Sequence, residues 1–137
     1  GLVGSEMCIR DSHPAEIAQS VKSVRELYKD KKITAIFQPH LYTRTRDFYK
    51  DFADSLSLLD EVILTEIYPA REQPIPGVSS RLIYDNLRPG IEKCICPKED
   101  ILNLLSKKSV EVLIVLGAGD LDNYVPSITQ LLEQQSK

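Results

Sequence analysis

The sequence has little cysteine, no excess of basic charge and no long apolar run, and each absence excludes a class of protein. Three cysteines in 137 residues are too few, and odd in number, for the disulfide framework of a small secreted domain. The net charge of -3 argues against a partner such as nucleic acid or an anionic membrane surface. No stretch approaches the roughly 20 apolar residues that span a bilayer, and the first residues lack the pattern of a signal peptide.

The cysteines do not form a metal-binding pattern either. Cys94 and Cys96 are two residues apart in an apolar stretch, so on a strand they point the same way. The imidazoles available to join them are His13 and His40, and the chain contains no CxxC spacing. We therefore expect no metal site and interpret the cysteines as buried structural thiols of a cytoplasmic protein.

What the sequence does contain is typical of one globular domain, with 42% apolar and 27% charged residues. Helical and strand patterns alternate along it. Apolar residues at helical spacing predict helices at residues 15–29, 45–59, about 80–87, 98–105 and near 125–132. Short β-branched runs predict strands at residues 33–37, 61–67, 91–96 and 110–116. Helices between apolar strands imply an α/β fold with a mostly parallel sheet flanked by helices.

Ligands of such sheets gather at the carboxyl ends of the strands, and the first loop there is rich in polar groups. Residues 38–46 read QPHLYTRTR and lead into the second predicted helix. His40 and Arg44 would lie beside a helix N-terminus, which favours an anion such as a carboxylate or phosphate. The alternative is a helix capped by Thr43 or Thr45 with solvated arginines, and the residues alone leave both open.

Two further loops lie at the same end of the predicted sheet. Residues 66–77 contain three prolines, which stiffen a loop that holds its shape for a partner. The third loop, GAGD at residues 117–120, is not a full dinucleotide fingerprint or phosphate loop. We interpret Gly117 as part of a tight turn, while Asp120 either caps the next segment or meets a ligand.

Together these segments resemble the C-terminal domain of the Mur ligases. The matching stretches are FQPHLYTRTRD at residues 37–47, DEVIL and IYPARE at residues 60–64 and 67–72, PIPGVS at residues 74–79, and the glycine turn at residues 117–120. The long signatures point to the alanine-adding branch of the family. The resemblance implies a Rossmann-like three-layer domain at residues 13–137.

The chain departs from the family pattern in two places. Residues 1–12 do not resemble the family, and we expect them to be a leader foreign to the domain. His13 matches the end of a family segment that precedes the first helix, but Asp11 and Ser12 replace the residues expected before it. Leu41 stands where many members carry a second arginine, which leaves Arg44 to make more of the anion contact.

The resemblance also implies a reaction. ATP phosphorylates the carboxylate of UDP-N-acetylmuramate, the amine of L-alanine attacks the acyl phosphate, and an amide for peptidoglycan synthesis results. It places Arg44, with His13 and His40, at the carboxylate of the amino acid. It makes Tyr68, Arg71, Glu72 and Asp120 candidates for contact with the nucleotide or another domain.

The family carries its ATP phosphate loop and Mg2+ ligands on a central domain and its UDP-sugar site on an N-terminal domain. Neither is in these 137 residues, so we expect no catalytic residue in this chain and no ligation by the chain alone. The alternative function is a free-standing α/β module that binds an anion or nucleotide without catalysis.

Overall fold

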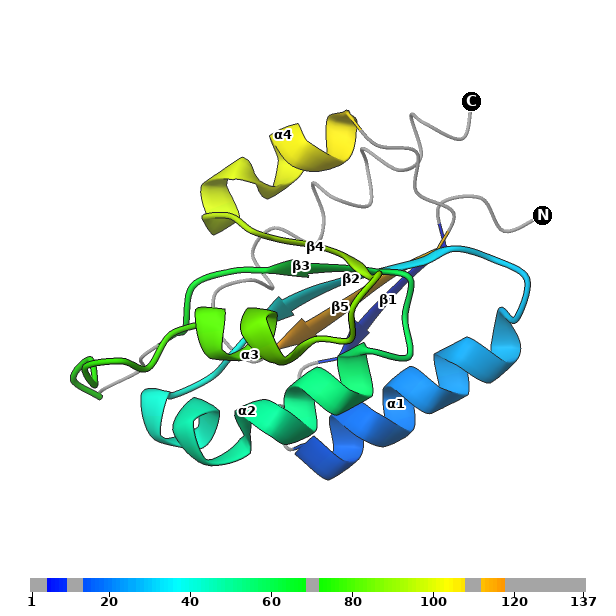
Figure 1. Cartoon of the computed structure of the whole chain (residues 1–137). Helices are drawn as coiled ribbons and strands as arrows, with labels where there is room; N and C mark the ends of the chain where they lie inside the picture. The colour runs from blue at the N-terminus through cyan, green and yellow to red at the C-terminus, as the bar shows by residue number, and fades with distance from the viewer. Residues whose placement is uncertain (1–4, 10–13, 69–71, 108–111, 118–137) are drawn as a thin grey trace.

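The computed structural model describes residues 5–9, 14–68, 72–107 and 112–117, and Figure 1 shows their arrangement. The strands are β1 (Ser5–Ile9), β2 (Ile33–Gln38), β3 (Glu61–Leu64), β4 (Glu92–Ile95) and β5 (Val112–Gly117). The helices are α1 (Pro14–Leu27), α2 (Tyr42–Leu56), α3 (Arg81–Asn86) and α4 (Ile101–Ser106), with a 3₁₀ turn η1 (Lys98–Asp100) before α4.

The strands form one five-stranded sheet in the order β1-β5-β2-β3-β4. Every pairing among the described strands is parallel, as the alternation of helix and strand predicts. The carboxyl ends of neighbouring strands therefore lie along one edge of the sheet. This edge is where the site is built.

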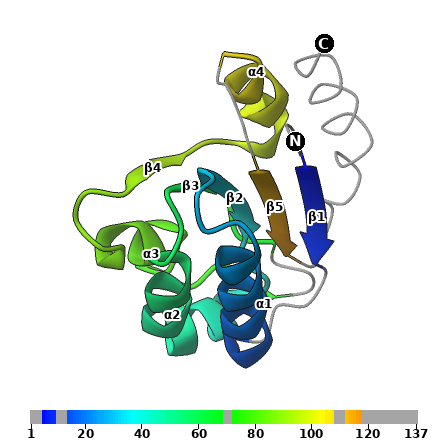
Figure 2. The same cartoon turned by 90° about the vertical axis from the view of Figure 1, so that its right-hand side faces the viewer.

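Helices cover both faces of the sheet. Helices α1, α2 and α3 lie on one side and α4 on the other (Figures 1 and 2). Side chains alternate between the two layers because successive residues of a strand point to opposite faces. In β2, Ala35 and Phe37 pack in the cluster under α1 and α2, whereas Ile36 packs with Ile101 and Leu105 of α4. The result is the three-layer α/β domain expected from the family resemblance.

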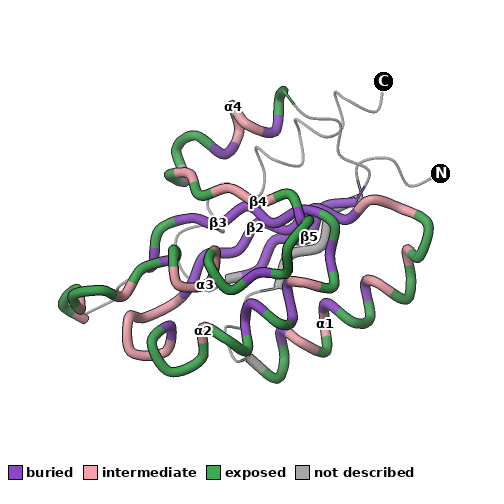
Figure 3. The backbone as a smooth tube through the Cα atoms, viewed as in Figure 1, coloured by how far each residue is buried: buried purple, intermediate pink, exposed green. Residues whose placement is uncertain are grey.

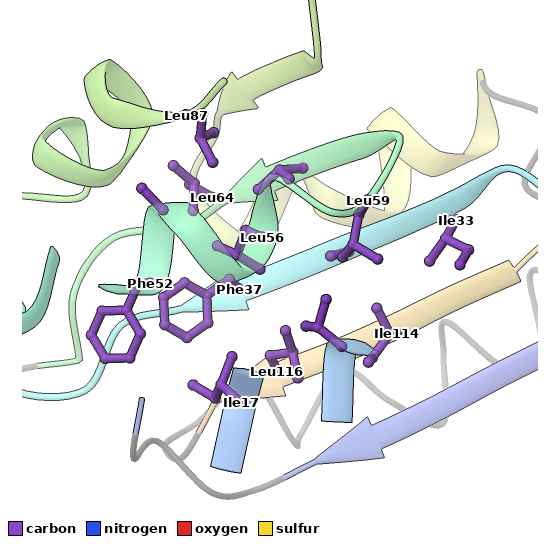
Figure 4. Packing of buried hydrophobic residues seen from close by; sticks show 14 of the residues in the cluster. Ile17, Ile33, Phe37, Phe52, Leu56, Leu59, Leu64, Leu87, Ile114 and Leu116 are labelled. Atoms are coloured by element: carbon purple, nitrogen blue, oxygen red, sulfur yellow. The ribbon is translucent and has the colours of Figure 1, made fainter. Parts of the chain in front are cut away.

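The larger cluster shows why the sequence folds this way. Ile17 of α1 and Phe52 and Leu56 of α2 are almost fully buried, and Figure 4 shows them packed beside Phe37 of β2. The rings of Phe37 and Phe52 are 5.1 Å apart at their centroids. Each such side chain contributes roughly 1.5–3 kcal/mol when removed from water.

Figure 3 shows the sheet as the most buried part of the chain and the outer helix faces as exposed. Two apolar residues predicted to face the core do not. Leu27 at the end of α1 is 66% exposed and Phe48 of α2 is 37% exposed.

Several element bounds differ from those predicted. Helix α2 begins at Tyr42, three residues before its predicted start, and β3 ends at Leu64 rather than residue 67. Strand β1 was not expected, and it pairs with β5 from Ser5↔Val112 to Ile9↔Leu116. Its backbone therefore extends the sheet by one strand. The predicted last helix and the turn at residues 118–120 lie outside the described residues.

Within the described part of the chain, no helix has the length and apolar character that crossing a bilayer requires.

Candidate functional site

The loops that follow β2 and β3 run side by side beyond the edge of the sheet. His40 and Tyr68 form a parallel bridge. The Leu41 amide donates to the Tyr68 carbonyl at 2.9 Å, and the Tyr68 amide donates to the Pro39 carbonyl at 2.8 Å. The pairing of β2 with β3 thus continues into the loops that follow them. As a result, the matched segments around His40 and around Tyr68 lie against each other.

Two aromatic rings stack where these loops meet. The imidazole of His40 lies 5.7 Å from the ring of Tyr68, with an angle of 15° between the planes. Burial lowers the pKa of His40, the Arg44 guanidinium lowers it further, and the Glu72 carboxylate opposes this more weakly. His40 is therefore mostly neutral at pH 7.

The start of α2 differs from the expected cap. Leu41 is the N-cap residue and makes no side-chain cap hydrogen bond, so the alternative of Thr43 or Thr45 as N-cap is wrong. The Thr45 hydroxyl instead donates back to the Leu41 carbonyl at 2.9 Å. Leu41 has a φ of 71°, a conformation that a leucine adopts at a cost of order 1–3 kcal/mol. The hydrogen bonds on both sides of Leu41 hold it there.

The carboxylate of Glu72, which comes from the loop after β3, caps α2 instead. Oε1 of Glu72 accepts the Thr43 backbone N–H at 3.1 Å, and Oε2 accepts the Thr43 hydroxyl at 2.6 Å. The hydrogen bond from the Thr43 hydroxyl is the main reason that the pKa of Glu72 lies below its ordinary value; backbone N–H groups and the charge of Arg46 add to the effect. Glu72 is therefore ionised at neutral pH and lies where a helix N-terminus favours an anion.

The two arginines of the first loop differ in setting. Arg44 is half-buried and acts on His40 electrostatically. Arg46 is exposed, and its guanidinium pairs with Asp47 at 3.0 Å. The structure thus brings together His40, Arg44, Tyr68 and Glu72 of the predicted site residues. The other three, His13, Arg71 and Asp120, lie outside the described residues.

A cleft of about 530 Å³ lies next to this cluster. Its wall includes the carboxylate-bearing Glu66 after β3 and Ile95 at the end of β4, so it also belongs to the carboxyl edge of the sheet. The full lining is Tyr42, Glu66, Ile67, Val78, Ser79, Ser80, Arg81 and Ile95. The sequence did not assign a binding role to these residues, although Tyr42 and residues 66–67 belong to the loops predicted at this end of the sheet.

Serine residues shape the far wall of the cleft. Ser80 is the N-cap residue of α3, but its buried hydroxyl donates to the carbonyl of Thr65 and not to the helix. The Ser79 hydroxyl accepts the Arg81 amide at 3.2 Å. The loop from Glu72 to Ser80 is thereby attached to α2 at one end and to the end of β3 at the other.

Cys94 and Cys96 belong to the layer of the domain that contains α4. Cys94 and Cys96 are half-buried against the α4 side of the sheet, and burial raises the pKa of the Cys96 thiol to about 11. A thiol with such a pKa is almost fully protonated at neutral pH, and so it is a poor nucleophile. The described residues contain no group of three or more His, Cys, Asp or Glu side chains placed to hold a metal ion.

Comparison with known proteins shows the family to which the chain belongs. The family model described as "Mur ligase, glutamate ligase domain" matches residues 12–121. The chain is 76% identical over 123 residues to the UDP-N-acetylmuramate–L-alanine ligase of Phocaeicola vulgatus, covering 90% of this chain and 27% of that protein. It is 55% identical over 123 residues to the ligase of the same name from Parabacteroides distasonis, covering 26% of it.

Solved structures give the same fold. The UDP-N-acetylmuramate-alanine ligase from Thermotoga maritima superimposes with a TM-score of 0.67 at 28% identity, over 96% of this chain and 27% of that chain. A murein peptide ligase from Psychrobacter arcticus superimposes with a TM-score of 0.71 at 15% identity, over 96% of this chain and 28% of that one, and shows the fold alone. The chain spans about a quarter of the length of these relatives.

Proposed function

Because this chain belongs to the Mur ligase family, through its glutamate ligase domain, we propose that it is the C-terminal domain of a UDP-N-acetylmuramate–L-alanine ligase. In this role it serves the cytoplasmic synthesis of peptidoglycan precursors. Proteins of that name share up to 76% of its residues over the aligned part. The remaining length of those relatives would carry the sites for ATP and UDP-N-acetylmuramate.

The observation that supports this proposal most directly is the cluster at the start of α2. Arg44 is half-buried at the carboxyl edge of the sheet, beside a neutral His40. A guanidinium in such a setting binds a carboxylate with two parallel hydrogen bonds. Held in this way, the carboxylate of L-alanine would leave its amine directed toward an acyl phosphate bound by the other domains.

The described residues do not fit a role in holding Mg2+, because they include no cluster of ligands for a metal. In a ligase of this kind, Mg2+ neutralises the charge of the transferring phosphoryl group. We therefore assign to this chain the binding and orientation of the amino acid and the exclusion of water on domain closure. His13, Arg71 and Asp120 remain proposed contributors to the amino-acid, nucleotide or interdomain contacts.

Calorimetry of L-alanine against the purified chain tests the assignment of Arg44. We expect weak binding in the wild type and a loss of roughly tenfold or more in Arg44→Ala, since a charge-assisted pair contributes about 1.5–3 kcal/mol. Arg46→Ala is the matched control, because it removes a guanidinium that is exposed and paired with Asp47. Equal alanine affinity in wild type and Arg44→Ala would contradict the role of Arg44.

Turnover and gene context test the wider proposal. The chain alone should form no product from ATP, L-alanine and UDP-N-acetylmuramate, and product formation would overturn its assignment as one domain of the ligase. An upstream reading frame that encodes a phosphate loop of the GxGKT/S type supports the ligase. A natural start codon near His13, with binding of inorganic phosphate, would favour the free-standing module instead.

A further inference from the structure

The carboxylate of Glu72 occupies the place where the predicted anion site was expected. It lies 29 residues beyond Thr43 in sequence, yet it accepts both the backbone N–H and the hydroxyl of that residue, at 3.1 and 2.6 Å. The first-turn N–H groups of a helix have no partner within the helix. Glu72 satisfies one of them from a separate loop.

This contact has a consequence for any ligand carboxylate. A helix N-terminus attracts one anion through its free N–H groups and its dipole. A carboxylate tethered to the same chain has an effective concentration in the millimolar range or above. A small free carboxylate therefore competes poorly for the start of α2 while Glu72 is bound there.

The same contact fixes the loop that carries Tyr68. The His40–Tyr68 stack and the Leu41–Tyr68 hydrogen bond hold the beginning of this loop, and Ser80 holds its end at the Thr65 carbonyl. Glu72 adds a third attachment between the two. The charge of Arg46 acts on Glu72, and the charges of Glu72 and Arg44 both act on His40.

We propose that Glu72 is a positioning residue: its carboxylate occupies the anion position at the start of α2, docks the loop after β3 there, and so positions the ligation site of the proposed function. The inference rests on the proposed function for its last part only. The docking of Glu72 is a property of the chain without any substrate, and it is tested without one.

Acetate is the probe for the first part. In ¹⁵N-labelled wild-type chain at constant ionic strength, the Thr43 amide resonance should show no saturable shift up to about 100 mM sodium acetate, because the tethered carboxylate excludes the free one. In Glu72→Gln, and more clearly in Glu72→Ala, acetate should shift that resonance with roughly tenfold or greater apparent affinity. Glu66→Gln is the matched control, since it removes a nearby loop carboxylate on the cleft wall, and it should behave as wild type.

The titration of His40, followed by NMR of the imidazole, is the second readout. Glu72→Gln should lower the pKa of His40 further, because it removes the negative charge that opposes the effects of burial and Arg44. A general loss of packing would expose His40 and move its pKa the other way, toward 6.5. The readout therefore separates positioning from a merely structural role.

Two results would overturn the proposal: a wild-type Thr43 amide that responds to acetate as strongly as the variants do, or a Glu72→Gln chain whose Thr43 resonance and His40 pKa are unchanged. Neither readout uses L-alanine or ATP. Failure of the alanine calorimetry therefore counts against the proposed function alone, and failure of the acetate titration counts against the role of Glu72 alone.

Discussion

At the scale of single residues, Asp60 joins three parts of the fold at the amino ends of the strands. Its Oδ2 accepts two hydrogen bonds, one from the Ile33 backbone N–H at 2.8 Å and one from Nη1 of Arg25 at 2.8 Å. The other terminal nitrogen of Arg25 donates to the carbonyls of Tyr28, Lys29 and Lys31. This network satisfies carbonyl groups at the end of α1 and connects the helix to the start of β2 and β3.

The pKa of Asp60 makes this network sensitive to pH. Partial burial would raise that pKa, but the hydrogen bonds from Ile33 and Arg25 and the charges of Arg25 and Lys32 outweigh it, so the pKa lies below its ordinary value of 3.8. A carboxyl whose pKa is lowered by folding stabilises the folded state above its unfolded pKa. That contribution is lost as the pH falls through the folded pKa.

We predict that Asp60→Asn lowers the free energy of unfolding by about 1 kcal/mol at pH 7, a value kept small because the side chain is 42% exposed. Urea denaturation at pH 7 and across the range below about pH 4 measures this. The difference between variant and wild type should shrink as the pH falls. Asp54→Asn, at an exposed position of α2, is the control, and an equal loss of stability there would contradict the role of Asp60.

At the scale of elements, α2 joins the core to the site. Its later turns bury Phe52, Ala53 and Leu56 against the sheet, and its first turn carries Thr43 and Arg44. A helix fixed along its length by packing gives its first residues a defined position. The packing of its buried face therefore positions Thr43 and Arg44 at the start of the helix.

Phe52 and Phe48 provide a test of this packing within one helix. Phe52 is 1% exposed and Phe48 is 37% exposed. We predict that Phe52→Ala lowers the free energy of unfolding by about 3–5 kcal/mol, because it leaves a cavity beside Phe37, and that Phe48→Ala costs about 1 kcal/mol or less. Both substitutions change helix propensity by the same amount. The difference between their unfolding free energies, measured by urea denaturation, therefore reports the difference in burial. Should Phe52→Ala fail to fold, Phe52→Leu must still cost more than Phe48→Leu; equal costs would be incompatible with the packing.

At the scale of the whole molecule, β5 lies between β1 and β2 and has partners on both sides. The family model matches from residue 12 onward, so β1 lies outside the matched part although it extends the same sheet. β1 therefore belongs to the sheet although the family model does not include it. The expectation that residues 1–12 form a foreign leader concerns their origin and stays a prediction.

Removing residues 1–11 tests whether β1 belongs to the folded domain. We predict that a chain beginning at Ser12 loses on the order of 2 kcal/mol of unfolding free energy, because several ladder hydrogen bonds to β5 disappear. Hydrogen exchange should become faster at those amides of residues 112–117 that face β1, while those that face β2 stay protected. Unchanged stability and exchange would show that residues 1–11 contribute nothing to the fold.

The sequence by itself determined the local elements and the edge at which the site lies. The β-branched runs at residues 33–37 and 110–116 became the centre of the sheet, and helical spacing placed Ile17, Val21 and Phe52 in the core. These predictions held because burial of one face imposes a period of 3.6 or 2 residues on the sequence itself. Element ends were less well predicted, as α2 shows, because they depend on contacts beyond the helix.

Only the tertiary structure decided what meets at that edge. The order of the strands, the recruitment of β1 and the capping of Thr43 by Glu72 all join residues far apart in the chain. No local pattern records such a pairing, since any exposed carboxylate in a loop is a possible partner for a helix N-terminus until the fold brings one of them there. Sequence therefore identified the polar residues of this edge, and the fold determined that Glu72 is the carboxylate that binds the start of α2.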